Sequence, residues 1–154
     1  MHGNGTVRRR TAISFRVFGQ NSHAVSAYTK LNLRELENSA EKAGLAPAME
    51  ARFARGPLGC ERSGLSLQRI APNERQPWGH RHHDSEEIYV VVEGSGRASL
   101  DGEVVELRRW DALRVAPSTM RAFEAGPDGL EFLAFGAGTS GLADVEAEPG
   151  WWPS

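Results

Sequence analysis

Residues 79–96, which read GHRHHDSEEIYVVVEGSG, decide the fold that we expect for this chain. The run from Ile88 to Val92 is apolar and rich in β-branched side chains, which is typical of a buried strand, and the glycines at 94 and 96 end it. Three histidines and two glutamates stand directly before this run. The segment therefore predicts a strand and, beside it, a group of side chains with the chemistry of metal ligands.

The chain on both sides of this segment is typical of short strands and turns. The 154 residues include 17 glycines and 8 prolines, which favour many turns. Asp101-Gly102 and Pro127-Asp128-Gly129 are predicted to be hairpin turns. Without a helical pattern after residue 50, this spacing predicts an all-β fold, either an antiparallel barrel or a double-sheet sandwich. The expected strands are residues 50–54, 65–71, 87–92, 97–100, 103–107, 112–116, 121–125 and 130–135.

One short helix is expected near the N-terminus, over residues 33–43. Asn32 can cap it, Glu35 stands where a capping box places its carboxylate, and Gly44 can end it in the left-handed conformation. Residues 1–27 show no clear period and are expected to form a flexible arm. Residues 28–154 are then expected to be a single domain with a barrel core at about 50–140, and the aromatic tail at 149–153 is expected to fold back on it.

Composition and charge exclude several classes of protein. The 18 basic and 20 acidic residues leave a formal charge of -2, which argues against a nucleic-acid partner. The one cysteine, Cys60, cannot form an internal disulfide. No apolar run approaches the roughly 20 residues that cross a bilayer, and the N-terminus lacks the apolar core of a signal peptide. We therefore expect a cytoplasmic protein without a membrane partner.

The histidine cluster predicts a metal site. His80 and His82 lie two residues apart, so on a strand they project from the same face at a separation of roughly 6 to 7 Å. Asp84 and Ser85 favour a turn, which would bring Glu87 back beside the histidines on the neighbouring strand. Two imidazoles and one carboxylate can hold one divalent metal ion and leave other positions open for water or substrate.

Other residues near this cluster have alternative interpretations. His83 would point to solvent on a regular strand, and Glu86 would replace Glu87 as the ligand if the turn were one residue shorter. Tyr89 shares the face of Glu87 and is expected to line the same cavity. Gln68, on the strand before the motif, would add to the polar side of the pocket if it faces inward. A polar hairpin edge that holds no ion is the alternative to a metal site.

The cluster resembles the first motif of the cupin superfamily. That motif consists of a glycine, five residues, H-x-H, three or four residues, a glutamate, six residues and a glycine. The residues that match it are His80, His82, Glu87 and Gly94, and Glu74 stands in place of the first glycine. Residues 107–123 are similar in rhythm to the second cupin motif, although every signature position is changed and Arg121 stands where the fourth metal ligand would be.

The resemblance covers about residues 50–140 and points to a small single-domain cupin, of a bacterial group without a known activity. It implies a jelly-roll barrel of two antiparallel sheets, a metal or small-ligand pocket inside one mouth, and a homodimer. Cupins include enzymes of several classes as well as binding proteins, so the family does not by itself name a reaction. A structural dimer without a ligand is a further reading, in which Tyr89, Phe123 and Phe135 would fill the cavity.

Arg121 leaves two functional predictions open, because an arginine stays charged and cannot ligate a cation. In the first reading His80, His82 and Glu87 hold zinc, iron, manganese or nickel, and Arg121 binds the charge of a small carboxylated or sugar-like ligand. In the alternative reading Arg121 pairs with Glu87, and the protein is a metal-free binding module with Arg121 as its anion anchor. Whether the protein is an enzyme is left open by the sequence.

Overall fold

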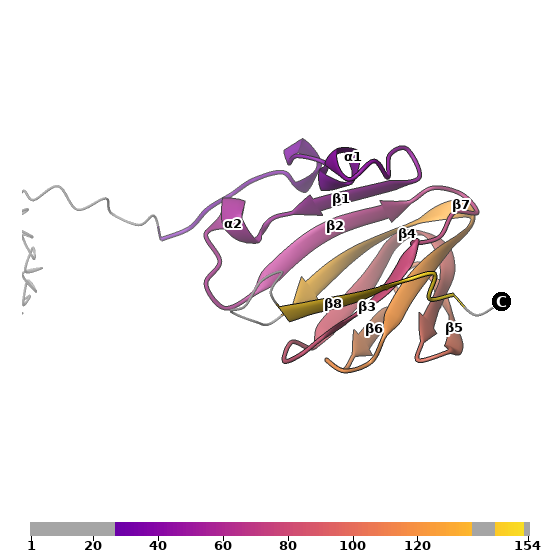
Figure 1. Cartoon of the computed structure of the whole chain (residues 1–154). Coiled ribbons are helices and arrows are strands. Elements are labelled where there is room, and N and C mark those ends of the chain that lie inside the picture. Colours follow the sequence, from indigo (N-terminus) through magenta and orange to yellow (C-terminus); the bar gives the residue numbers. More distant parts are fainter. Residues whose placement is uncertain (1–26, 137–143, 153–154) are drawn as a thin grey trace, which may run out of the picture.

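The structure is a computed structural model that describes residues 27–136 and 144–152 (Figure 1). The predicted arm at 1–27 lies outside the described residues except for its last position. In these residues, eight strands form one curled, antiparallel sheet. One short helix lies beside the first strand of the sheet and another lies beside the second (Figure 1). The strands are β1 (Met49–Phe53), β2 (Gly64–Ile70), β3 (Trp78–His82), β4 (Glu87–Leu100), β5 (Glu103–Arg108), β6 (Ala112–Val115), β7 (Arg121–Gly136) and β8 (Val145–Pro149).

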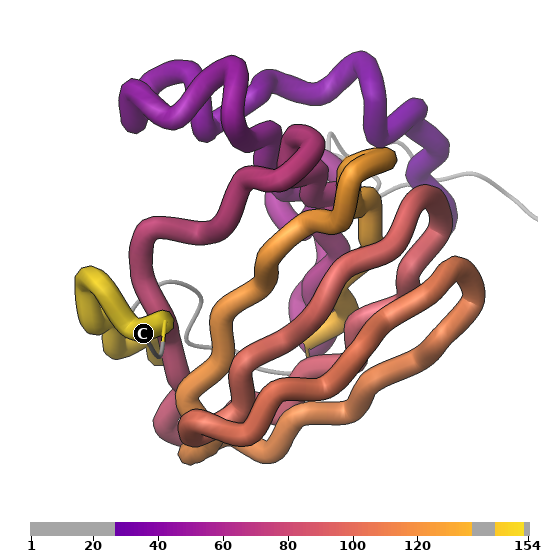
Figure 2. Tube along the Cα trace, turned by 90° about the vertical axis from the view of Figure 1, so that its right-hand side faces the viewer, coloured from indigo at the N-terminus to yellow at the C-terminus, as the bar shows by residue number. Residues whose placement is uncertain are grey.

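Two long, bent strands form the centre of the sheet. β4 has 14 residues and β7 has 16, and they pair from Glu87 opposite Gly136 to Leu100 opposite Arg121. β4 also pairs with β5 and β6, while β7 also pairs with β2 and β3. Each long strand bends and pairs with different neighbours along its length, so the sheet curls into the barrel-like shape seen in Figure 2.

The hairpin predicted at Pro127-Asp128-Gly129 is wrong, whereas the one at Asp101-Gly102 is confirmed. The chain does not reverse at residues 127–129, since Ala125 pairs with Gly96 and Leu130 then pairs with Gly94 on the same strand, β4. The residues between them bulge out of β7, so the predicted strands 121–125 and 130–135 are one strand. Asp101 and Gly102 join β4 to β5 with φ angles of 48° and 90°, as a tight hairpin turn requires.

The predicted N-terminal helix is present but broken into two short pieces. The first is a 3₁₀ turn, η1 (Leu33–Glu35), and the second is α1 (Ser39–Lys42). The helix stops after η1 because Asn38 caps a new start, where its side chain accepts hydrogen bonds from the backbone N–H of Ala40 at 3.2 Å and of Ala51 at 3.0 Å. Gly44 has a φ of 71°, as predicted for the helix end. A further helical turn, α2 (Arg55–Leu58), was not expected.

The core consists of side chains from β2, β4, β5, β6 and β7. The rings of Tyr89, Phe123 and Phe132 pack together with centroids 4.7 to 5.8 Å apart. Phe135 was expected among them, but it is 42% exposed, since its position on β7 alternates with the buried Phe132 and Ala134. The buried apolar cluster consists of Ile70, Tyr89, Val91, Ala98, Leu107, Val115, Phe123, Ala125, Leu130, Phe132 and Ala134.

The tail folds back against the body, as predicted. Its strand, β8, was not expected, and it pairs with β3 from Trp78 opposite Pro149 to His82 opposite Val145 (Figure 1). Beyond β8, Trp151 packs against Gly79, and the ring of Trp152 lies near the guanidinium groups of two arginines, Arg75 and Arg97. Within the described ranges, every helix is too short to cross a membrane.

Candidate metal centre

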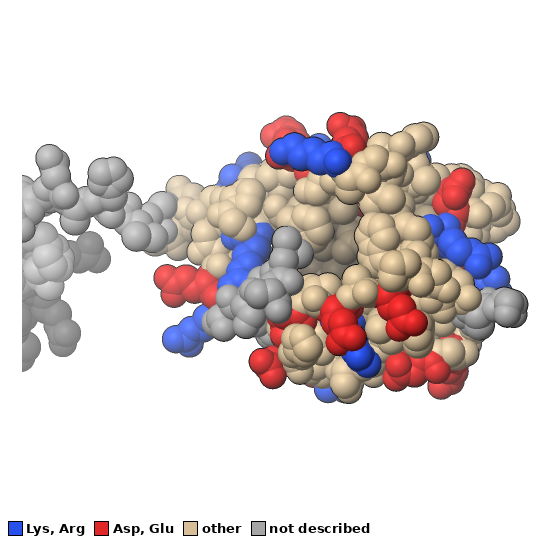
Figure 3. Space-filling model, viewed as in Figure 1, with Lys and Arg blue, Asp and Glu red and all other residues tan. Residues whose placement is uncertain are grey.

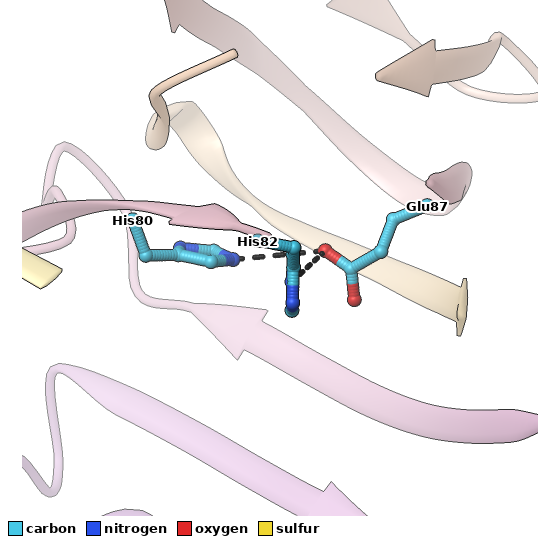
Figure 4. Close-up of side chains that lie close together, drawn as sticks. All are labelled: His80, His82 and Glu87. Carbon is cyan, nitrogen blue, oxygen red and sulfur yellow. Dashed lines mark ion pairs between the residues drawn. The ribbon is translucent and has the colours of Figure 1, made fainter. Parts of the chain in front are cut away.

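The structure brings the side chains of His80, His82 and Glu87 together (Figure 4). Both histidines project from the same face of β3, because they lie two residues apart, and a bend after β3 returns the chain so that Glu87 begins β4. Nε2 of His80 lies 3.6 Å from Oε2 of Glu87, and Nε2 of His82 lies 3.1 Å from the same oxygen. One ligand atom from each residue lies within 4.8 Å of the other two, so the three side chains could hold one metal ion.

The neighbouring candidates point away from this group. His83 is exposed, as the strand alternation predicted. Glu86 is also exposed, and its carboxylate forms an ion pair with Arg114 at 2.7 Å. The turn therefore has the length that places Glu87, and not Glu86, beside the histidines.

Burial and hydrogen bonding set the charges in the group. The side chains of His80, His82 and Glu87 are 17%, 10% and 16% exposed. Burial alone would raise the pKa of the Glu87 carboxyl, but the contacts that Glu87 makes with His80, His82 and Tyr89 outweigh it and hold that pKa well below its ordinary value. Burial lowers the pKa of His80. The group is thus a carboxylate facing an imidazole that favours its neutral form, which is the form that binds metals.

Tyr89 and Gln68 were predicted to contact a ligand. Tyr89 is buried among the core aromatic rings, and its hydroxyl donates to Oε2 of Glu87. Burial, together with the charge of Glu87, raises the pKa of Tyr89 well above its ordinary value, so the phenol keeps its proton. Gln68 lies on β2 and donates to the hydroxyl of Ser66 at 3.3 Å. The ligand roles of both residues stay predictions.

Arg121 lies behind the group and is fully buried. It begins β7 opposite His80, and its Nη1 donates to three backbone carbonyls: His80 at 3.3 Å, Pro117 at 3.4 Å and Thr119 at 3.0 Å. Nη2 lies 3.6 Å from Oε2 of Glu87, and both Nη2 and Nε lack a hydrogen-bond partner among the described residues. The guanidinium is therefore held in place by backbone groups, and its Nη2 faces the Glu87 carboxylate.

One further residue of the site, Asp144, could not be predicted from the sequence. Its side chain is 3% exposed, and Oδ2 lies 3.2 Å from Nδ1 of His82. The Ser85 side chain and the backbone N–H groups of Asp84 and Ser85 donate hydrogen bonds to this carboxylate and lower its pKa to about 2. Asp144 stands just before β8, a strand that the sequence did not predict, and no spacing in the sequence connects it to the histidines.

One face of the molecule is hollowed and carries side chains of both charges (Figure 3). In the view of Figure 1, the coloured surface has a recess near its centre, between β2 and β8 (Figure 3). Acidic and basic side chains are interspersed on this face (Figure 3). The side chains of His80 and Glu87 are partly exposed to solvent.

Comparison with known proteins supports the fold and the family. Residues 66–135 match a family model described as a cupin domain. A stretch of 45 residues is 40% identical to an uncharacterized protein of Methanocaldococcus jannaschii, and it spans 29% of this chain and 36% of that protein's length. Residues 66–135 of this chain therefore resemble a cupin domain, and the chain has the cupin fold.

Three solved structures illustrate how widely this fold is used. A cupin protein from Bacteroides fragilis is 24% identical, with a TM-score of 0.61 over 77% of this chain and 90% of that one. A Streptomyces nucleoside dehydratase is 16% identical, with a TM-score of 0.63 over 79% and 91%. A salicylate 1,2-dioxygenase from Pseudaminobacter salicylatoxidans is 15% identical, with a TM-score of 0.59 over 75% of this chain and 35% of that one. At these identities the likeness concerns the fold and not the reaction.

Proposed function

We propose that this cupin binds one divalent metal ion through His80, His82 and Glu87 and presents it to a small anionic ligand. One observation carries the metal part: His82 lies between two carboxylates, with Nδ1 3.2 Å from Asp144 and Nε2 3.1 Å from Glu87. A neutral imidazole carries only one N–H, so it can donate to only one of the two carboxylates. At its other nitrogen, a lone pair faces a carboxylate oxygen, and both are hydrogen-bond acceptors. A cation placed between Nε2 and Glu87 removes this conflict.

The three donors suit a transition metal or zinc. Imidazole nitrogens and a carboxylate oxygen bind zinc, iron, manganese and nickel, and three protein ligands leave positions free for water or substrate. Once bound, such an ion would act as a Lewis acid or as an oxygen-activating centre. Tyr89 and Arg121 would hold Glu87 in place, because both contact its Oε2.

The balance of buried charge favours an anionic ligand. Glu87 and Asp144 carry two negative charges and Arg121 carries one positive charge, which leaves one negative charge in the group when the imidazoles are neutral. A divalent ion would turn this into one positive charge, which a monoanion neutralises. Nε and Nη2 of the buried Arg121 make no hydrogen bond within the described residues, so they would bind such an anion, a carboxylate or the phosphate of a sugar-like molecule, where it reaches the guanidinium beside Glu87.

A metal-free binding module is the second candidate, and the approach of Arg121 to Glu87 at 3.6 Å favours it. In that protein the guanidinium offsets the Glu87 charge, and a proton on His82 satisfies both carboxylates. Arg121 would then bind the anion without an ion beside it. The predicted homodimer and the predicted cytoplasmic location stay predictions for either candidate.

Elemental analysis separates the two candidates. The protein is purified without an affinity tag, exposed in turn to zinc, iron, manganese and nickel, and freed of excess metal before the measurement. The metal-binding cupin retains about one equivalent of at least one of these metals per chain. If none is retained at a stoichiometric level, the metal-free module is the better account.

A further inference from the structure

The segment from Asp144 to Trp152 lies outside the residues that match the cupin family model, yet it lies against the strand that carries both histidines. β8 pairs with β3 along its full length, whereas β7 pairs with β3 only through Arg121 opposite His80. The backbone N–H of Gly150 donates to the carbonyl of Pro77 at 2.9 Å. The C-terminal segment is thus the neighbour that pairs with the whole length of the histidine strand.

Asp144 connects this segment directly to the site. Its Oδ1 accepts hydrogen bonds from the backbone N–H groups of His83 at 3.1 Å and Asp84 at 3.0 Å, and its Oδ2 accepts one from Ser85 at 3.2 Å. Oδ2 also lies 3.2 Å from Nδ1 of His82. One buried carboxylate therefore fixes the bend after β3 and contacts the histidine that precedes the bend.

The surroundings of Asp144 determine what it can offer to His82. Three N–H donors converge on its two oxygens, which favours the ionised carboxylate. An ionised carboxylate only accepts hydrogen bonds, so the nitrogen that faces it is favoured as the one that bears the proton. That nitrogen is Nδ1, and the lone pair of a neutral His82 is then on Nε2, which faces Glu87 (Figure 4).

From this geometry we propose that Asp144 is a positioning residue, which keeps the proton of His82 on Nδ1 and thereby leaves Nε2 free for the ion. The metal part of this statement rests on the proposed function above. Its tautomer part does not, because it concerns the metal-free protein. A carboxylate behind a histidine ligand orients the ring and makes its free nitrogen more basic.

The test uses the full chain and reads the tautomer directly. Long-range ¹H–¹⁵N NMR spectra of the metal-free protein, recorded at a pH at which His82 is neutral, show which ring nitrogen bears the proton. We expect the Nδ1–H form in the wild-type protein. An Nε2–H form in the wild-type protein would overturn the proposal without any mutation.

The informative variant is Asp144→Asn, with Asp84→Asn as the matched control. The asparagine keeps one oxygen for the backbone N–H groups, but its amide nitrogen donates where the carboxylate accepted, so the Nε2–H form of His82 should increase. Asp84 is exposed and adjacent to the same bend, and its variant makes the same change of charge. We expect Asp84→Asn to keep the wild-type tautomer, and thermal unfolding of both variants verifies that they are folded.

Metal binding gives the second measurement, which separates failure of this proposal from failure of the proposed function. Asp144→Asn should bind the best of the four metals about 10- to 100-fold more weakly, whereas Asp84→Asn should bind it like the wild-type protein. If Asp144→Asn folds, keeps the Nδ1–H form and binds metal with unchanged affinity, Asp144 has no positioning role. If no variant binds metal but the tautomer changes as expected, the positioning of His82 stands and the metal site fails.

Discussion

The Nη2 atom of Arg121 lies 3.6 Å from Oε2 of Glu87, the same oxygen that both histidines of the site approach. Arg121 cannot swing away from this position without breaking its hydrogen bonds to three backbone carbonyls. A fixed positive charge thus stands behind the carboxylate of the proposed metal site. This arrangement stabilises the ionised Glu87 and also limits the total charge that the site can accept.

Replacement of Arg121 by methionine should strongly destabilise the protein. The variant keeps most of the side-chain volume but leaves Glu87 without its cation and the three carbonyls without their donor, which should cost about 3 to 5 kcal/mol of unfolding free energy. The control is Arg114→Met, which removes an exposed partner of Glu86 and should cost less than about 1 kcal/mol. Urea titration of the metal-free variants measures both. Equal costs for the two variants would show that Arg121 is not held as described.

Removal of His82 should abolish tight metal binding, while removal of its neighbour should not. His82→Ala deletes one of the three metal ligands. The loss of metal affinity should therefore exceed roughly 100-fold, which is the largest loss typical when a residue that hydrogen-bonds to a ligand is replaced. His83→Ala is the matched control, because His83 is the next residue along the chain and is exposed. Calorimetric titration with the metal that the wild-type protein retains provides the comparison. Similar affinities for both variants would remove His82 from the site.

The stability of the metal-free protein should fall as the pH drops below the ordinary histidine range. Burial lowers the pKa of His80 from 6.5, so the unfolded chain takes up this proton more readily than the folded chain. The contribution of His80 therefore makes the free energy of unfolding decrease as the pH falls below 6.5. This contribution stops changing once the pH is below the lowered pKa of His80 in the folded protein.

His80→Asn should remove this part of the pH dependence, since asparagine does not titrate. His83→Asn serves as its control and should keep the wild-type slope. Urea titrations at pH values above about 5 measure the effect, because Glu87 contributes its own dependence only below its ordinary value of 4.5. A slope that is the same in His80→Asn and in the wild-type protein would contradict the burial of His80.

A side chain at Gly79 should collide with the C-terminal segment. A Cβ atom at this position would overlap the side chain of Trp151, whereas a Cβ at Gly56 would meet no atom within 4 Å. Gly79→Ala should therefore cost about 1 to 3 kcal/mol, and Gly56→Ala should cost much less. In a Trp151→Ala background the cost at Gly79 should largely disappear. Additive costs in the double variant would mean that Trp151 does not pack on the histidine strand.

The part of the site that is local in the chain could be predicted from the sequence. His80 and His82 share a face because a strand alternates its side chains, and the turn-forming Asp84 and Ser85 return the chain so that Glu87 stands beside them. Asp144 could not be found in this way. Its contact with His82 depends on β8 pairing with β3, a long-range pairing that no spacing in the sequence reveals.

Local signals were also ambiguous where the sheet decides the outcome. Pro127-Asp128-Gly129 has the residues of a hairpin turn, but pairing of β7 with β4 on both sides of it makes it a bulge in one strand. Asn32 was predicted to cap one helix, and it does cap η1, but Asn38 is a second cap that also accepts a hydrogen bond from Ala51 on β1. In both places tertiary contacts select one of two structures that the local residues allow.

The most direct test of the central claim is a crystal structure of the metal-loaded protein with anomalous diffraction data collected at the absorption edge of that metal. We predict one anomalous peak, about 2.0 to 2.2 Å from Nε2 of His80, Nε2 of His82 and a carboxylate oxygen of Glu87. A peak elsewhere, or a site in which Glu87 contacts the two imidazoles directly with no peak between them, would contradict the account.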